Sequence, residues 1–424
     1  MTKAKTELSL LSLLHLGLIA LFHSTRGWKS FGVTHKEETL QLAVPKRFKE
    51  GDLVGLQLGL EGETAEKMKE VGKIDMPSLG ITPQGDRISE WSLSSRMEKT
   101  YGQPLIAILW QDALRILSDA LPEECKHTGY ECFNISQGEE GAVVHFTKED
   151  ETISIEAPLV IGADGIHSTT RNILFGAIEP RDNGRTMWRA VIDRSLCSHE
   201  ALATGTLATM QNGRTTFIIN GVKEKLYWAF SVTDESTEGE TRIRSKDNVE
   251  AKERLFKYFQ GWDVASHIIQ ATDPEFILER RVLDVPVLPK WSCGHVVLLG
   301  DAVHAVTPSY GQGANLAFED GLELAKHLST SLDLRSALEA YESARIPRAS
   351  IVSEKSQSLG VRPTDEFYDW LYTGVPELIQ TRSGSSWILK QARIASNWNW
   401  KQAGIASSWN WKRLEFEAVG SSWI

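Results

Sequence analysis

The sequence lacks the cysteine spacing of a disulfide framework or of a zinc site. Its four cysteines are scattered along 424 residues, and no two of them form a CxxC pair. Disulfide-rich secreted folds and structural metal centres are therefore not indicated, and we expect no metal and a reducing, cytoplasmic compartment. The length suffices for a large core, in two domains or in one composite domain.

The sequence also lacks any dense run of lysine and arginine. Its formal net charge at neutral pH is −10, whereas a nucleic-acid groove needs clustered basic side chains to contact phosphates. We therefore expect no nucleic-acid partner, and this net charge favours small neutral or cationic ligands. No feature of the sequence predicts an oligomeric state.

No apolar run reaches the roughly 20 residues that a membrane-spanning helix requires. The stretch Leu8–Phe22 follows two lysines, as the core of a signal peptide does, but Ser9, Ser12 and His15 interrupt it. The sequence favours a buried first helix here. A signal or membrane anchor is the alternative interpretation.

The C-terminal segment contains a near-repeat with a period of eleven residues. "KQARIASNWNW" begins at Lys390 and "KQAGIASSWNW" begins at Lys401. In a helix this period keeps Trp387, Trp398 and Trp409 on one stripe, which suits a helix lying at a membrane surface. Membrane-surface contact through this repeat or through the N-terminal stretch is thus one expectation, and a merely duplicated tail is the other.

Hydrophobic patterns predict both helices and strands. Apolar residues at helical spacing predict an amphipathic helix over Leu105–Leu121, and β-forming runs predict strands at Ala142–Phe146 and Thr152–Ile161. From about Phe175 to Val287 the chain turns into short β-rich pieces. Two of these flank Asn220-Gly221, which is a strong hairpin signal.

The chain returns to an alternating pattern after this β-rich segment. "HVVLLG", from His295 to Gly300, is a continuous apolar run typical of a strand buried on both faces. Two long helices are predicted after it, at Gly313–Ser329 and at Ser336–Ser358.

A first strand-end motif, "VIGADGIHSTTR", covers Val160–Arg171. A buried strand ends there, and the following turn presents Asp164 and Gly165. A carboxylate at the carboxyl end of a strand is well placed to bind a ligand in the crevice of an open α/β sheet. Alternatively, Asp164 caps the helix that follows, and the two interpretations do not exclude each other.

A second strand-end motif is "LLGDAVHAVTPSYGQGANLAFEDG", which begins at Leu298. Asp301 closes the strand, and Gly311 and Gly313 allow the backbone to approach a ligand because they have no Cβ atom. Their amides, with those of Ala314 and Asn315, begin a helix whose dipole favours negative charge. We interpret His304 in this motif as structural, as histidines in such turns commonly are.

With these two motifs the chain resembles the single-component FAD-dependent aromatic hydroxylases and monooxygenases, a family that includes salicylate hydroxylases. That family carries GADG and GDAxHxxxPxxGQGxNxxxED motifs in this order, and both are nearly intact here. The resemblance covers approximately Gly55–Arg348. It implies an α/β fold with a Rossmann-like FAD-binding domain, an inserted β-sheet substrate domain and C-terminal helices.

The resemblance also implies roles for individual residues. Asp301 would bind the ribityl chain of FAD, and the backbone from Gly311 to Asn315 would face the pyrimidine end of the isoalloxazine. Asp164, with the adjacent Gly165, and Arg171 would lie near the cofactor phosphates and the approach of the nicotinamide donor.

Arg189 in "MWRAV" and Tyr227 in "KLYWAF" fall where the family places substrate-domain strands. By the resemblance they are candidates for substrate contact or catalysis. Ordinary sheet residues are the alternative interpretation of both.

The sequence departs from the family at its N-terminal end, because no GxGxxG loop occurs. Gly17 lies where the third glycine is expected, Glu37 where the ribose-binding acid is expected, and Gly55 in a segment resembling the next glycine-rich one. Three interpretations stay open: the adenosine half of FAD is held differently, the gene model is wrong at its first exon, or FAD binding is impaired.

The sequence therefore predicts an FAD-dependent monooxygenase that takes hydride from NADPH or NADH. Through a flavin C4a-hydroperoxide formed with dioxygen, it would hydroxylate a small aromatic or electron-rich organic substrate, with alkene epoxidation as a variant. A non-catalytic relic of the flavoenzyme fold, acting through its Trp-rich tail, is the rival.

The predicted domain division follows the motifs. Residues 1–174 form the first part of the FAD-binding domain and 175–287 the β-rich substrate domain. Residues 288–360 form the second part of the FAD-binding domain with its helices, and 361–424 form the Trp-rich repeat tail.

Overall fold

The computed structural model describes residues 31–34, 40–44, 53–56, 63–73, 77–91, 97–100, 104–120, 126–148, 151–203, 205–357 and 365–373. The strands are β1 (Phe31–Thr34), β2 (Leu40–Val44), β3 (Leu53–Leu56), β4 (Ser78–Ile81), β5 (Arg87–Trp91), β6 (Ile106–Leu109), β7 (Lys126–Thr128), β8 (Glu131–Gln137), β9 (Ala142–Lys148), β10 (Glu151–Ala157), β11 (Val160–Gly162), β12 (Arg181–Asp193), β13 (Thr206–Gln211), β14 (Arg214–Val222), β15 (Lys225–Thr233), β16 (Leu278–Asp284), β17 (Ser292–Cys293) and β18 (Val296–Leu298). The α-helices are α2 (Glu63–Val71), α4 (Trp110–Asp119), α5 (Thr169–Phe175), α6 (Asn248–Phe259), α7 (Asp263–Ala271), α8 (Asp301–His304), α9 (Gly313–Thr330), α10 (Leu334–Gln357) and α11 (Asp365–Thr373).

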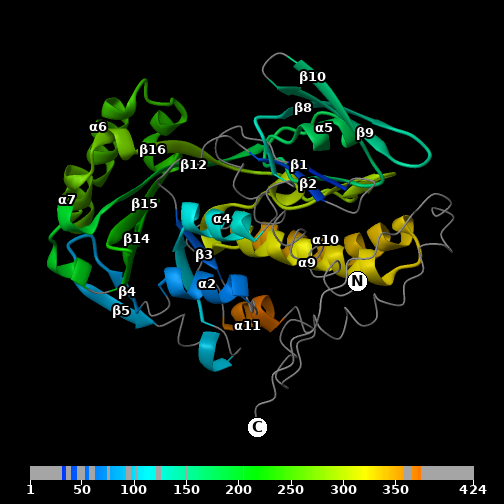
Figure 1. Ribbon diagram of the computed structural model, residues 1–424. Coiled ribbons are helices and arrows are strands. Elements are labelled where there is room, and N and C mark those ends of the chain that lie inside the picture. The colour runs from blue at the N-terminus through cyan, green and yellow to red at the C-terminus, as the bar shows by residue number, and fades with distance from the viewer. Residues whose placement is uncertain are drawn as a thin grey trace, which may run out of the picture.

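A mixed six-stranded sheet, in the order β17-β18-β11-β1-β2-β7, forms one half of the molecule. Its central strands β11 and β18 run parallel, whereas β1 pairs antiparallel with both β11 and β2. The long helices α9 and α10 lie side by side along this half (Figure 1). Side chains of the two strands and the two helices, such as Ile161, Leu298, Phe318 and Tyr341, share one buried core.

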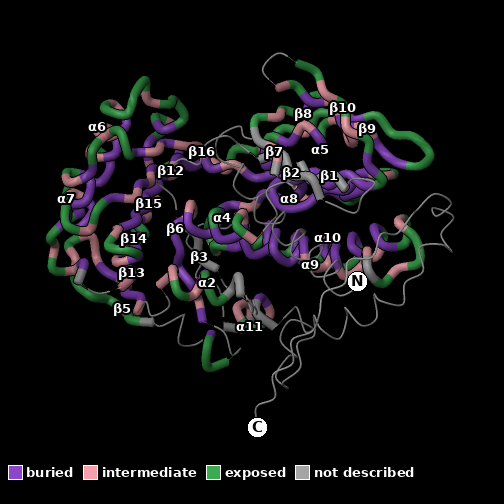
Figure 2. The backbone as a smooth tube through the Cα atoms, in the orientation of Figure 1, coloured by how far each residue is buried: buried purple, intermediate pink, exposed green. Residues whose placement is uncertain are grey.

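A seven-stranded sheet, in the order β16-β12-β15-β14-β13-β4-β5, forms the other half. Alternation along its strands separates two faces. Trp188 and Phe230 belong to the face that packs on α6 and α7, while Tyr227 and Ala229 pack with residues of β6. Figure 2 shows this division as buried strands between the outer helices and the other half of the molecule. The sheet is therefore covered by helices on one side and faces the six-stranded half on the other.

This architecture confirms the predicted fold class: a Rossmann-like α/β part, an inserted β-sheet part and C-terminal helices. The large sheet also takes β4 and β5 from the chain before residue 174. The division into domains at residues 174, 287 and 360 stays a prediction. The two predicted long helices are confirmed as α9 and α10.

The prediction of one helix over Leu105–Leu121 is wrong in its first part. Residues Ile106–Leu109 form β6, whose side chains are all buried, and the helix begins at Trp110. A short run of apolar residues satisfies helical spacing and a buried strand equally well. The predicted strand Thr152–Ile161 is likewise divided into β10 and β11 around Pro158, which has no amide to donate to a ladder.

The predicted hairpin exists, but its turn lies three residues beyond Asn220. Strands β14 and β15 pair across Lys223 and Glu224, which both have positive φ as a two-residue hairpin turn requires. Gly221 instead occupies a register shift within β14, with a φ of +84°. The Asn-Gly signal therefore marks a β-bulge next to the turn.

Both segments considered for membrane contact, Leu8–Phe22 and the C-terminal repeat, lie outside the described residues. Within the described part of the chain, no helix combines the length and apolarity needed to cross a membrane. The predictions for the two ends stay as they are.

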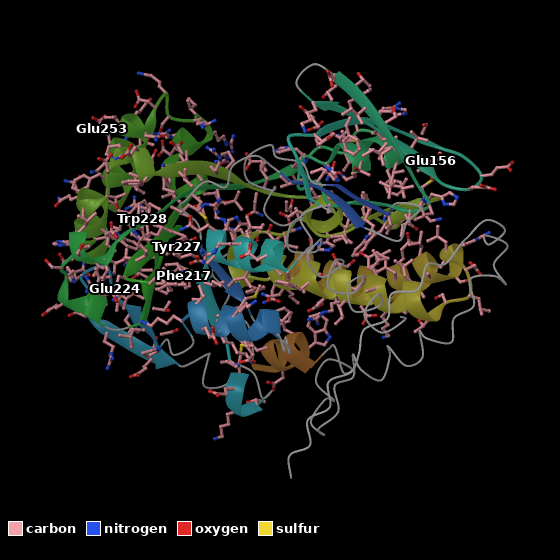
Figure 3. The ribbon with its side chains drawn as sticks, in the orientation of Figure 1. Glu156, Phe217, Glu224, Tyr227, Trp228 and Glu253 are labelled. Carbon is pink, nitrogen blue, oxygen red and sulfur yellow. The ribbon has the colours of Figure 1, made fainter. Side chains whose placement is uncertain are left out.

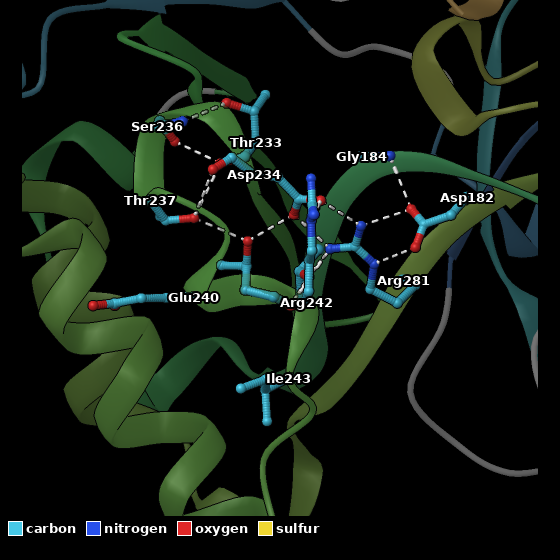
Figure 4. A network of polar contacts seen from close by, with 12 residues as sticks. Asp182, Gly184, Thr233, Asp234, Ser236, Thr237, Glu240, Arg242, Ile243 and Arg281 are labelled. Atoms are coloured by element: carbon cyan, nitrogen blue, oxygen red, sulfur yellow. Dashed lines mark hydrogen bonds and ion pairs between the residues drawn. The ribbon is translucent and has the colours of Figure 1, made fainter.

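A polar network ties the loop after β15 to strands β12 and β16 (Figure 4). Asp234 accepts hydrogen bonds from Arg281 at 2.7 and 2.9 Å, from Thr241 at 2.9 Å and from Arg242 at 3.0 Å. Arg281 also binds Asp182. The hydrogen bonds from Arg281 have the largest effect and lower the pKa of Asp234 from 3.8 to about 2, although burial opposes them.

This lowered pKa predicts an acid-dependent contribution to stability. Ionised Asp234 stabilises the fold by about 2 kcal/mol above pH 4, and the contribution is lost as the pH falls through the folded-state pKa of about 2. Asp234→Asn should therefore lower the free energy of unfolding at pH 7, and its difference from wild type should shrink toward pH 2.5. Urea unfolding at several pH values measures this, with the exposed neighbour Glu235→Gln as control. A pH-independent difference would contradict the account.

Candidate functional site

The two strand-end motifs meet at one edge of the six-stranded sheet. Strand β11 leads into Asp164 and strand β18 leads into Asp301, and the strands are parallel neighbours. The amide of Leu299 donates to the carbonyl of Gly162 at 3.1 Å, which continues the pairing to the strand ends. Both turns therefore leave the sheet at its carboxyl edge, where open α/β sheets bind their ligands.

Asp164 is buried and holds the beginning of α5. Ser168 Oγ donates to one carboxylate oxygen at 2.5 Å, and the amide of Thr170 donates to the other at 3.0 Å. Ser168 itself caps the helix by accepting from the amide of Arg171. Burial raises the pKa of Asp164, and these hydrogen bonds oppose the rise. The contacts match the interpretation of Asp164 as an anchor of the helix start, and its role toward a cofactor stays a prediction.

Arg171 connects the two motifs from inside the protein. Its guanidinium donates to the carbonyls of Ile166 at 2.8 Å, Ala302 at 2.9 Å and Ile178 at 3.0 Å, and its side chain is 1% exposed. Ile166 belongs to the first motif and Ala302 to the second. Arg171 therefore fixes the two turns relative to each other, while the expected approach of a phosphate to it stays a prediction.

Asp301 begins the short helix α8, and it is 6% exposed. The preceding Gly300 has a φ of +61° and a ψ of −144°, a conformation open to glycine and strained for other residues. This turn directs the chain away from β18 at the position of the acid. Gly165 similarly has a φ of +77° in the first motif.

Asp320 of α9 holds the second motif in place. One carboxylate oxygen accepts from the amide of Gly300 at 2.8 Å and contacts His304 Nε2 at 2.6 Å, and the other accepts from Arg345 Nε at 2.7 Å. Burial by itself raises the pKa of Asp320, but the charges of His304 and Arg345 outweigh it and lower the pKa to about 2. His304 is therefore a structural partner, as the sequence indicated.

Glu319 extends this network to α10. It binds Arg345 at 2.6 Å and Arg348 at 2.5 Å, and all three side chains are buried. The sequence reasoning assigned no role to Glu319 and Asp320, although both belong to the second motif. The contact of Asp320 with His304, 16 residues earlier in the chain, was not visible from spacing.

The loop between α8 and α9 has open space beside Gly311. Gly311 has a φ of +62°, and no described atom lies within 4 Å of where a Cβ would stand. Asn315 Nδ2 donates to the carbonyl of Gly311 at 2.9 Å and holds the loop against the helix start. The amides of Gly313, Ala314 and Asn315 form the first turn of an 18-residue helix, whose amino end favours negative charge.

The predicted residues Arg189 and Tyr227 lie on the same face of the seven-stranded sheet. Arg189 pairs with Ala229 across β12 and β15, and Tyr227 pairs with Val191. Tyr227 packs with Ala107 and Leu109 of β6 in the core between the two halves. Figure 3 shows Tyr227 near Phe217 of the neighbouring strand β14. The fold thus brings both candidates to the face that looks toward the motif-bearing half.

Gly55 lies outside the two large sheets. Gly55 is in β3, which pairs with β6 and lies against α9. Glu37, expected at the ribose, is outside the described residues, as is Gly17. Within the described part of the chain, no group of three or more potential ligand residues could hold a metal ion.

The residues at the sheet edge fit an FAD isoalloxazine. The open glycine at position 311 leaves room for a planar group, and the helix start behind it supplies amide donors for an electron-rich edge.

Comparison with known proteins agrees with this arrangement. A family model described as an FAD binding domain matches residues 66–356. The chain is 28% identical over 281 residues to the aurachin C monooxygenase/isomerase of Stigmatella aurantiaca, covering 66% of this chain and 70% of that protein. It is 32% identical over 233 residues to the chloroplastic zeaxanthin epoxidase of Capsicum annuum, covering 50% of this chain but only 34% of that longer protein.

Solved structures show the same fold. HpxO of Klebsiella pneumoniae, crystallised with FAD and uric acid, matches with a TM-score of 0.65 and 22% identity, over 83% of this chain and 87% of that one. The 2,6-dihydroxypyridine-3-hydroxylase of Arthrobacter nicotinovorans matches with a TM-score of 0.59 and 18% identity, over 78% of this chain and 85% of that one.

Fold, motifs and family match together define a flavoprotein of the monooxygenase class, an oxidoreductase that binds FAD. The chain belongs to the FAD-binding domain family whose model matches residues 66–356.

The network around Asp320 predicts the effect of breaking it. Asp320→Asn removes one of the two acids that compensate Arg345 and should lower the free energy of unfolding by about 3 to 5 kcal/mol, the usual cost of breaking a buried ion pair. Urea unfolding measures this, and Glu354→Gln, on the exposed side of α10, is the control. Equal stability of both variants would show that the network contributes nothing to the fold.

Proposed function

We propose that the protein is a monooxygenase that takes hydride from NADPH or NADH and uses dioxygen to hydroxylate a small aromatic or electron-rich organic substrate. The observation that carries the proposal is the position of Asp301 at the carboxyl edge of β11 and β18, together with the start of α9, where Ala314 packs in the same core as Ala302 and Val303. An acid and an open amide-rich helix start at such an edge suit the sugar-alcohol chain and the electron-rich end of a flavin.

In this proposal Asp301 holds the ribityl chain, and the amides from Gly311 to Asn315 hold the pyrimidine edge of the isoalloxazine. Bound FAD would supply hydride acceptance and oxygen activation. The C4a-hydroperoxide route implied by the family resemblance belongs to the proposal. Asp164, Gly165 and Arg171 support the neighbouring turn, and their approach to phosphates and nicotinamide is part of the same proposal.

The protein itself would stabilise charge on the cofactor and position the reactants, and would do little proton transfer. The amino end of α9 stabilises negative charge on a reduced cofactor without a titrating side chain, because its amide dipoles are fixed by the helix. The Asp320 network keeps that helix and the Asp301 turn in one geometry. Arg189 and Tyr227 would contact the substrate from the facing sheet.

The division into an FAD-binding domain at 1–174 and 288–360 and a substrate domain at 175–287 is a proposal, as is the cytoplasmic location. Alkene epoxidation is a second candidate reaction, because one relative that the chain partly matches is a zeaxanthin epoxidase.

Replacing Asp301 tests the site. The flavin content of Asp301→Ala should be at least tenfold lower than that of wild type, because the substitution removes a proposed contact with the cofactor. Its circular dichroism spectrum should stay that of wild type. Flavin content after gel filtration measures this, and Asp119→Ala, at the exposed end of α4, should keep its flavin. Unchanged flavin occupancy in Asp301→Ala would show that this assignment is wrong.

Turnover tests the reaction. The FAD-loaded protein should oxidise NADPH or NADH faster when one of a panel of phenols and aromatic acids is present. Mass spectrometry should find one oxygen atom from ¹⁸O₂ in the product. Reduction of the flavin without oxygen incorporation into any compound of the panel or into an alkene set would contradict the monooxygenase proposal.

A further inference from the structure

Arg185 is a buried cation without a counter-ion among the described residues. Its side chain is 4% exposed, and Nη2 donates one long hydrogen bond, 3.3 Å, to Ser309 Oγ. Its Nε has no hydrogen-bond partner. A buried charge left in this state is costly unless something compensates it.

The other buried arginines of the described chain are compensated. Arg345 and Arg348 bind Glu319, and Arg171 donates to three backbone carbonyls. Burial lowers the pKa of Arg185 to about 10, which still leaves it charged at neutral pH. Arg185 therefore carries a positive charge whose partner is not part of the described protein.

The sheet register places Arg185 on the same face as Arg189. Arg185 pairs with Thr233 and Arg189 with Ala229, so the two arginines alternate with core residues and point to one side. Arg280 of β16, opposite Met187, lies on this side too. The acids on this face of β12, β14, β15 and β16 are Asp193 and Asp284, and each is bound to a basic side chain, Lys225 at 2.7 Å and Arg181 at 2.8 Å. The face is therefore positively charged.

Two contacts locate this face between the proposed flavin loop and β6. Ser309, the partner of Arg185, lies two residues before Gly311. At the other end of the face, Tyr227 packs against β6. Between these ends lies Phe217, whose ring is 42% exposed and offers an apolar surface to an aromatic ligand.

We infer that Arg185 binds a carboxylate of the substrate, supported by the positive field of Arg189 and Arg280, so that this protein acts on small aromatic acids. The inference rests on the proposed function, because it places the substrate between the sheet face and the flavin loop. A guanidinium pairs with a carboxylate by charge and by its fork of donors, and exclusion of water strengthens the pair.

Matched acids and amides test the inference. The FAD-loaded protein is titrated with benzoate and benzamide, phenylacetate and phenylacetamide, and salicylate and salicylamide, and binding is followed by the change in the flavin spectrum. At least one acid should bind tenfold or more tightly than its amide. In Arg185→Gln this preference should fall below threefold, with flavin content unchanged.

Arg214→Gln is the matched control. Arg214 lies in the same sheet but pairs with Val232, on the opposite face, so this variant should keep the preference for the acid. Shifts in melting temperature caused by the same ligands give a second readout that does not depend on bound flavin. If Arg185→Gln fails to fold, these shifts are measured on wild type alone and compare each acid with its amide.

Three results would overturn the inference. The first is equal binding of every acid and its amide to wild type, and the second is an undiminished preference for the acid in Arg185→Gln. The third is loss of FAD from Arg185→Gln, which would assign the arginine to the cofactor. Wild type that binds FAD and is reduced by NADPH but shows no acid preference would contradict this inference alone. Failure to bind FAD would contradict the proposed function instead.

Discussion

The carboxylate of Asp320 joins three parts of the chain that the site needs together. It binds the amide of Gly300 at the end of β18, the imidazole of His304 in the following turn and the guanidinium of Arg345 on α10. Because the acid itself lies in α9, these contacts fix the amino end of that helix relative to the Asp301 turn. A buried network of this kind contributes less to the net stability of the fold than to holding its parts in a single geometry.

The sequence predicted the elements of this arrangement better than their contacts. The buried strand before Asp301 and the helix after Gly311 could be predicted because a continuous apolar run and a helical pattern are local signals. The helix assigned to Ile106–Leu109 was wrong because four apolar residues do not distinguish a helix from a buried strand. The Asn220-Gly221 pair indicated a hairpin correctly but occupies a bulge, since Lys223 and Glu224 adopt the turn conformation.

The sequence gives the net charge of the chain but not how that charge is distributed over the folded molecule. A net charge of −10 favours neutral or cationic ligands for the molecule as a whole. The face that carries Arg185 and Arg189 is nevertheless positive, because strand register brings Arg280 beside them while the acids of this face are paired with other basic side chains. No spacing rule indicates that Arg185 lacks an acidic partner, since the one hydrogen bond that its side chain makes among the described residues is to Ser309, 124 residues away. Local field, and not net charge, determines what a site binds.

The account depends on FAD being held at the Asp301 and Gly311 end, whatever the N-terminal segment contributes. The most direct measurement is the visible spectrum of the purified protein after incubation with FAD and removal of the excess, followed by anaerobic addition of NADPH or NADH. The account predicts a yellow protein whose flavin is bleached by the reduced nicotinamide. A protein that stays colourless would contradict it and would favour a non-catalytic relic of the flavoenzyme fold.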